Sequence, residues 1–275
     1  MPASLESFDA RPQVQPPLDP AFLPAASWNR SFADLVVASD NPAPIRFALE
    51  QSANSIFCHD AEILPPQHPQ AELNFRFAER LLKFLLWSRG GYRVYFDGPS
   101  ELGEALRSHF ENTATGRFDA DFMGTVYERP FEIILTKDLP SEQDSARQLG
   151  RHLDGCRIGF DLGGSDRKVA AVVDGAVVFS EETSWDPYYE KDPSYHREGV
   201  IDSLSKAANH LPKVEAIGGS SAGVYVDNQP RVASLFRGVV EDLFDSKVKP
   251  MFRNLSKEWD VPFEVINDGD VTALA

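Results

Sequence analysis

The chain has 275 residues, of which 42% are hydrophobic, and a formal net charge of -15, so it has room for about two domains. The acidic residues lie in both halves and would repel phosphate backbones, which excludes nucleic acid as an expected partner. No apolar run approaches the roughly 20 residues of a membrane helix, and the N-terminus lacks the pattern of a secretory signal. We therefore expect a cytoplasmic protein with no membrane partner.

Residues 1–40 predict a proline-rich arm. Six prolines fall within its first 24 residues, and no apolar periodicity is sustained. This composition favours a mostly extended segment that wraps the body or stays mobile. Phe22, Leu23, Trp28 and Phe32 are candidates to anchor it.

Residues 41–150 predict a small α/β module with no assigned chemical role. Alternating apolar residues at 44–49 and 54–64 indicate a β-hairpin. The next elements are a helix over 71–91, a strand over 92–96, and a helix over 98–110 with Ser100 as its N-cap. Residues 122–135 are expected to be extended. Residues 141–155 are polar and predicted to be helical in part, with the domain boundary near residue 150.

Isolated polar groups in this sequence favour no site. His59, Asp60 and His109 each lack a spaced partner, which favours surface or capped-core roles. Cys58 and Cys156 stand far apart, outside any cluster of Cys or His, which predicts two reduced thiols.

Residues 151–275 predict a mixed sheet. Three segments, 156–162, 168–174 and 176–185, indicate antiparallel strands joined by tight turns. There follow a helix over 195–211, a strand within 214–226, a long helix over 239–259, a strand over 262–268, and a helix that begins at about Gly269. Strands separated by helices add in parallel, so the later strands extend one mixed five-stranded sheet.

The first turn of this sheet carries Asp161, Gly163, Gly164 and Ser165. Glycines can adopt positive φ and bring backbone N–H groups close to an anion, and the serine adds a hydroxyl donor. The aspartate can hold a hydrated Mg²⁺ beside nucleotide phosphates. The alternative is an ordinary glycine hairpin with an exposed aspartate.

These motifs and the order β-β-β-α-β-α-β resemble the N-terminal ATPase subdomain of the ROK (repressor, open reading frame, kinase) family, over about 120 residues from Arg157. That family belongs to the superfamily of actin-like ATPases and sugar kinases. The resemblance implies an α/β protein whose second half has a ribonuclease H-like or actin-like fold. It also implies ATP and Mg²⁺ as cofactors, with Asp161 binding the metal through water.

The resemblance assigns further residues to a sugar site. Gly219, Ser220, Ser221 and Gly223 match the family's glycine-containing sugar segment, although the glycines are nearly as well explained by packing. Asn267 and Asp268 match its Asn-Asp pair. The resemblance implies that Asn267 binds sugar hydroxyls and that Asp268 is the general base, which accepts the proton of the attacking hydroxyl. An N-cap for the last helix is the alternative role for Asp268.

Three departures from the family qualify this interpretation. Asp166 adds negative charge where the family often has Lys or Asn, and we expect Arg167 and Lys168 to offset it. The first half, with strands between its helices, disfavours the repressor branch. No second phosphate loop, adenosine site or cysteine-ligated zinc precedes Ala275, so we expect the chain to be the front part of a longer protein.

The sequence therefore predicts the front half of an ATP-dependent sugar kinase, a transferase of carbohydrate metabolism that binds a sugar and ATP. A homodimer is implied by the resemblance only. The isolated chain is expected to be inactive, because such catalysis needs two lobes to close over the phosphates. The alternatives are a non-catalytic sugar or nucleotide sensor and another phosphoryl-transfer ATPase, such as a polyphosphate hydrolase.

Overall fold

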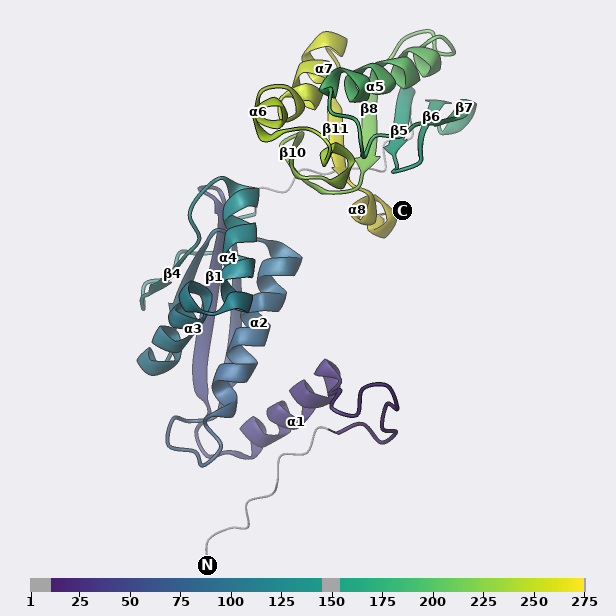
Figure 1. The fold of residues 1–275 in the computed structure, drawn as a ribbon. Helices are drawn as coiled ribbons and strands as arrows, with labels where there is room; N and C mark the ends of the chain where they lie inside the picture. Colours follow the sequence, from purple (N-terminus) through teal and green to yellow (C-terminus); the bar gives the residue numbers. More distant parts are fainter. Residues whose placement is uncertain (1–10, 145–153, 275) are drawn as a thin grey trace, which may run out of the picture. The chain divides into compact units, whose positions relative to one another are not determined.

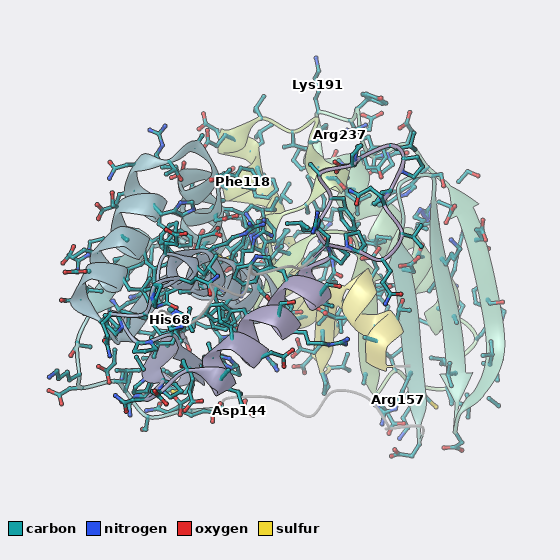
Figure 2. The ribbon with its side chains drawn as sticks, turned by 90° about the horizontal axis from the view of Figure 1, so that it is seen from below. His68, Phe118, Asp144, Arg157, Lys191 and Arg237 are labelled. Atoms are coloured by element: carbon teal, nitrogen blue, oxygen red, sulfur yellow. The ribbon has the colours of Figure 1, made fainter. Side chains whose placement is uncertain are left out.

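The computed structural model describes residues 11–144 and 154–274. The chain divides into two compact units, Met1–Ala146 and Arg147–Ala275 (Figure 1). Figure 2 shows the side chains from a second direction. The domain boundary predicted near residue 150 lies outside the described residues, as do residues 1–10 of the predicted arm. Of the helices in the described ranges, none is long and apolar enough to cross a membrane.

The first unit contains a four-stranded sheet in the order β2-β1-β3-β4. β1 pairs with β2 and β3 in antiparallel fashion, while β3 and β4 run parallel. The strands are β1 (Ala43–Ser52), β2 (Ser55–Ile63), β3 (Arg93–Asp97) and β4 (Glu132–Leu135). The helices are α1 (Ala25–Ala38), α2 (Leu73–Arg89), α3 (Ser100–Asn112) and α4 (Ala114–Tyr127), of which α2, α3 and α4 lie over one face of the sheet (Figure 1). The predicted hairpin, both predicted helices and the strand between them are confirmed, but the N-cap predicted at Ser100 is wrong, because α3 begins at Ser100 and its cap position is Pro99.

The extended arm predicted through residue 40 is wrong for residues 25–38, which form α1. Trp28, Phe32 and Val36 are spaced by four residues, so they share one helix face, and all three are buried. The prolines that suggested an arm end at Pro24, immediately before the helix. Trp28 and Phe32 therefore anchor this segment as a helix rather than as an extended arm.

The extended segment predicted over 122–135 is also wrong in its first half, where α4 continues to Tyr127. The Thr113 hydroxyl caps α4 by accepting a hydrogen bond from the Gly116 N–H at 3.0 Å. Glu128, with a φ of 54°, ends the helix in the left-handed conformation. Met123 and Val126 are buried, so packing overrides the β-branched and aromatic residues that favoured a strand.

The second unit contains a mixed five-stranded sheet, as the sequence predicted. In the structure its strands lie in the order β11-β8-β5-β6-β7. β5, β8 and β11 run parallel, and β6 is antiparallel to both β5 and β7. The strands are β5 (Cys156–Leu162), β6 (Asp166–Val173), β7 (Ala176–Ser184), β8 (Ala216–Ser221) and β11 (Phe263–Asn267). α5 (Pro193–Ala208) and α7 (Met251–Trp259) cover one face of this sheet, and α8 (Asp268–Leu274) follows β11 (Figure 1).

Two segments of this unit differ from the prediction. The single long helix expected over 239–259 is divided into α6 (Glu241–Leu243), a π-helix (Phe244–Val248) and α7, because Pro250 precedes α7 and cannot donate a helical hydrogen bond. The strand expected within 214–226 is divided as well. Its second part, β9 (Val224–Val226), pairs with β10 (Gln229–Val232) across a turn in which Asp227 and Asn228 have positive φ.

We predict that Phe32→Ala lowers the free energy of unfolding of the first unit by about 3–5 kcal/mol. Phe32 is 1% exposed, and its ring centroid lies 4.5 Å from that of Phe77, so truncation leaves a cavity. Urea denaturation measures the change. Val37→Ala on the same helix is the control, because Val37 is 82% exposed and should change stability by less than about 0.5 kcal/mol. Equal small effects would show that α1 is not part of the core.

Candidate functional site

The carboxyl ends of the three parallel strands meet in register. Asp161 in β5 lies opposite Ser220 in β8, and in the next row Ser221 lies opposite Asn267 in β11. Side chains alternate between the two faces of a strand, so paired Asp161 and Ser220 point to the same face. The Ser220 hydroxyl donates a hydrogen bond to Asp161 Oδ1 at 2.5 Å. The fold therefore brings these predicted site residues to one edge, where Asp268 begins α8.

The loop between β5 and β6 is held by Trp185. Its indole Nε1 donates to the Gly163 carbonyl at 2.8 Å, and its backbone N–H donates to the Ser165 carbonyl at 3.1 Å. The Gly163 N–H donates to the Asp166 carbonyl at 2.9 Å. Within the described residues, no acceptor takes a hydrogen bond from the N–H of Gly164 or Ser165. The loop therefore presents two backbone donors, as a phosphate-binding loop requires.

The expected positive φ is wrong for both glycines of this loop, since neither Gly163 nor Gly164 adopts it. Close approach explains the second glycine instead. A Cβ at Gly164 would lie 2.1 Å from the hydroxyl oxygen of Tyr188, which leaves no room for any side chain.

Asp166 is neutralised by one of the two expected cations. Lys168 forms an ion pair with its carboxylate, and the Ser165 hydroxyl donates to Asp166 Oδ2 at 2.8 Å. Hydrogen bonds from Lys168 and Ser165 hold the pKa of Asp166 below its usual range. Arg167 does not share this role, because its guanidinium binds the carboxylate of Asp202 on α5 at 2.8 Å.

Asn267 and Asp268 start α8. The Asn267 amide donates to the Gly223 carbonyl at 2.7 Å, and Asn267 Oδ1 accepts from the Gly269 N–H at 2.8 Å. Asp268 Oδ1 also accepts from the Gly269 N–H, at 2.9 Å, but the N-cap role considered for Asp268 is wrong, because α8 begins at Asp268 and the cap position is therefore Asn267. Asp268 is exposed, and no described residue donates to its second carboxylate oxygen. That oxygen can accept a proton from a ligand.

The other residues of the predicted sugar segment make contacts within the protein. A Cβ at Gly219 would lie 2.1 Å from Phe160 Cζ on the buried face. Gly223 has a φ of 134°, and a Cβ there would lie 2.6 Å from the Val232 carbonyl oxygen. The buried Ser221 hydroxyl accepts a hydrogen bond from the Tyr225 hydroxyl at 2.8 Å, and burial raises the pKa of Tyr225.

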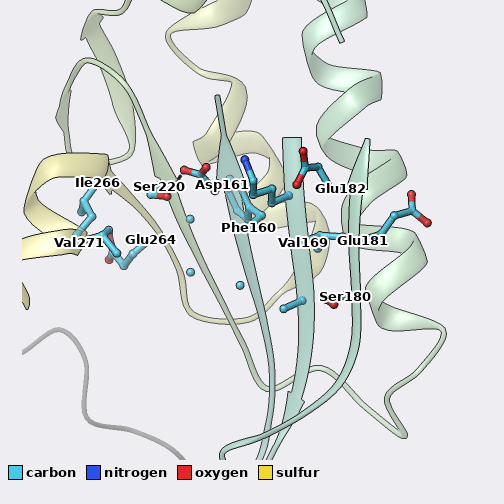
Figure 3. Close-up of a pocket in the computed structure, with 15 residues that line it drawn as sticks. Phe160, Asp161, Val169, Ser180, Glu181, Glu182, Ser220, Glu264, Ile266 and Val271 are labelled. Atoms are coloured by element: carbon cyan, nitrogen blue, oxygen red, sulfur yellow. Dashed lines mark hydrogen bonds between the residues drawn. The ribbon is translucent and has the colours of Figure 1, made fainter. Parts of the chain in front are cut away.

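A hollow of about 680 Å³ lies on the sheet face that Asp161 and Ser220 share (Figure 3). Gly159 and Gly218 form its floor, since they are paired in register and a Cβ on either would meet nothing within 4 Å. Glycine within a strand often marks a close approach of a ligand or backbone. Gly218 begins the glycine-containing segment that the sequence indicates, but Gly159 carries no local signal beyond its place two residues before Asp161. The remaining wall includes Lys168, Glu182, Glu264, Ile266 and Val271.

The described residues contain no group of three His, Cys, Asp or Glu side chains that could hold a metal. A hydrated Mg²⁺ needs less, because it binds through one or two carboxylates and keeps several waters. Asp161 fits that requirement, since Ser220 donates to only one of its oxygens.

No family model and no curated protein matches this sequence. Its fold is similar to that of a ROK hexokinase from Thermus thermophilus, with 17% identity and a TM-score of 0.33 over 44% of this chain and 36% of that one. It is also similar to that of a glucokinase from Parabacteroides distasonis, with 15% identity and a TM-score of 0.31 over 42% of this chain and 31% of that one. An exopolyphosphatase from Cytophaga hutchinsonii matches with 11% identity and a TM-score of 0.20 over 60% of this chain and 58% of that one.

The matched region spans about a third of the length of the two sugar kinases. At these identities and TM-scores, the likenesses carry no argument about activity. The strand order itself defines a mixed α/β fold.

We predict opposite effects for the same substitution at two adjacent glycines of β8. Gly219→Ala should lower the free energy of unfolding by about 1–3 kcal/mol, because the new methyl group meets the Phe160 ring. Gly218→Ala should leave it unchanged or raise it by up to about 1 kcal/mol, because the methyl group enters open space and the unfolded chain loses freedom. Urea denaturation of both variants measures the difference. Equal effects would contradict this assignment of the two faces.

Proposed function

We propose that this chain is the phosphate-binding and base-bearing part of a ROK-family, ATP-dependent sugar kinase. One observation carries the proposal: Asp161, the exposed Asp268 and two unengaged backbone donors lie at the same edge of one sheet. Phosphoryl transfer needs this combination of donors for phosphate oxygens and a carboxylate for the attacking hydroxyl.

On this proposal, the N–H groups of Gly164 and Ser165 bind phosphate oxygens of ATP, and Gly163 shapes the turn. Asp161 holds Mg²⁺ through water, with Ser220 orienting its carboxylate. The metal supplies positive charge that offsets the charge of the phosphates. Asp166 adds a negative charge beside the phosphates. Lys168 forms an ion pair with its carboxylate and so reduces its repulsion of the nucleotide.

Asp268 then acts as the general base. Its second oxygen accepts the proton of a sugar hydroxyl as that hydroxyl attacks the phosphoryl group. Asn267, which precedes Asp268, and Ser220, which bonds to Asp161, would contribute hydrogen bonds to the sugar. Gly219, Ser221 and Gly223 support these groups through the packing of the strand end.

Asp268→Asn should lower the turnover of the natural full-length protein with a hexose or amino-hexose by about 10²–10⁴-fold, because the amide cannot accept the proton. ADP release measures the rate. Asp270→Asn is the matched control, since it removes the same charge from the same first turn of α8 and should leave turnover unchanged.

Urea denaturation of both variants verifies that folding is intact. Unchanged turnover in Asp268→Asn would overturn the assignment of the base. Sugar binding without ATP consumption by the unmodified protein would instead indicate the non-catalytic sensor.

A further inference from the structure

Arg237, which follows the 3₁₀ turn Ser234–Phe236, rests on two tyrosine rings. Its Cζ lies 4.2 Å from the ring centroid of Tyr188 and 5.2 Å from that of Tyr189, both within the range of cation–π attraction. Within the described part of the chain, no carboxylate pairs with this guanidinium. That is notable in a protein with a net charge of -15. The side chain is exposed, so its five N–H donors remain available to a ligand.

The same tyrosine touches the glycine loop. Tyr188 lies so close to Gly164 that a Cβ there would be 2.1 Å from the Tyr188 hydroxyl oxygen. One ring therefore contacts both the loop with the unengaged N–H groups and the guanidinium. Arg157 lies near the amino end of β5, and Figure 2 shows Arg237 well away from it.

Two further contacts fix the backbone next to Arg237. His196 is fully buried in α5, and its Nε2 lies 3.0 Å from the Pro187 carbonyl and 3.1 Å from the Leu235 carbonyl. Both partners are acceptors, so Nε2 carries a proton and joins the two loops. Gly238 packs backbone against backbone, since a Cβ there would lie 2.6 Å from the Glu190 carbonyl oxygen. The backbone on either side of Arg237 is thus fixed, and the two tyrosine rings are what its guanidinium contacts.

We propose that Arg237 binds a carboxylate or phosphate oxyanion of the ligand held beside the glycine loop. The planar guanidinium matches such groups with two parallel hydrogen bonds. The oxyanion belongs either to an anionic sugar acceptor or to the nucleotide. The inference rests on the proposed function only for the place of the ligand.

Isothermal titration calorimetry of the chain with glucuronate, glucose 6-phosphate, ATP and glucose tests the proposal. Arg237→Gln should weaken binding of at least one anionic probe by about tenfold or more, and should leave binding of neutral glucose unchanged. Arg237→Lys should restore binding only in part, because the ammonium group lacks the planar fork. If Arg237→Gln loses affinity only for glucuronate or glucose 6-phosphate, the oxyanion belongs to the sugar acceptor. If it loses affinity only for ATP, the oxyanion belongs to the nucleotide.

Lys191→Gln is the matched control. It removes an equal charge from the loop that carries both tyrosines, and should change affinity by less than about threefold. Equal losses in Arg237→Gln and Lys191→Gln would mean general attraction by surface charge and would overturn the proposal. Absence of anion binding by the unmodified chain would overturn it as well.

The outcomes separate this inference from the proposed function. If anion binding depends on Arg237 while the natural protein phosphorylates no sugar, the inference stands and the kinase proposal fails. If the natural protein phosphorylates a neutral sugar with kcat and KM unchanged by Arg237→Gln, the kinase proposal stands and the inference fails.

Discussion

The common register of β5, β8 and β11 is the constraint on which the candidate site depends. It sets Asp161 opposite Ser220 and places Asn267 in the next row. A slip of one residue in β5 would turn Asp161 toward the helices and Leu162 toward the open face. Leu162 is 1% exposed in the core, so the hydrophobic cost of that slip preserves the position of the carboxylate.

α5 has a second role besides covering the sheet. Through Asp202 it binds the guanidinium of Arg167 in β6, and through His196 it binds the carbonyls of two edge loops. The His196 contact is buried, where hydrogen bonds are strong and unpaired groups are costly, whereas the Asp202 side chain remains 43% exposed. The helix therefore links the order of the core to the geometry of the loops beside Gly164.

The glycines of this unit serve different physical ends. Gly164 and Gly219 make room for the aromatic side chains of Tyr188 and Phe160, whereas Gly159 and Gly218 leave a hollow open. The sequence shows only that glycine is present. Because adjacent positions of a strand face opposite ways, the role of each glycine follows from its face and from what packs there.

The sequence alone determined the hairpin of the first unit and, in the second unit, the succession of strands and helices and the parallel direction of the later strands. Those features follow from local periodicity, from turn residues and from the rules of strand connection. The tertiary structure decided the helical state of residues 25–38 and 114–127 and the stacking of Arg237 on Tyr188. These depend on contacts between residues distant in sequence, whose burial energy outweighs local preference and which no local pattern encodes.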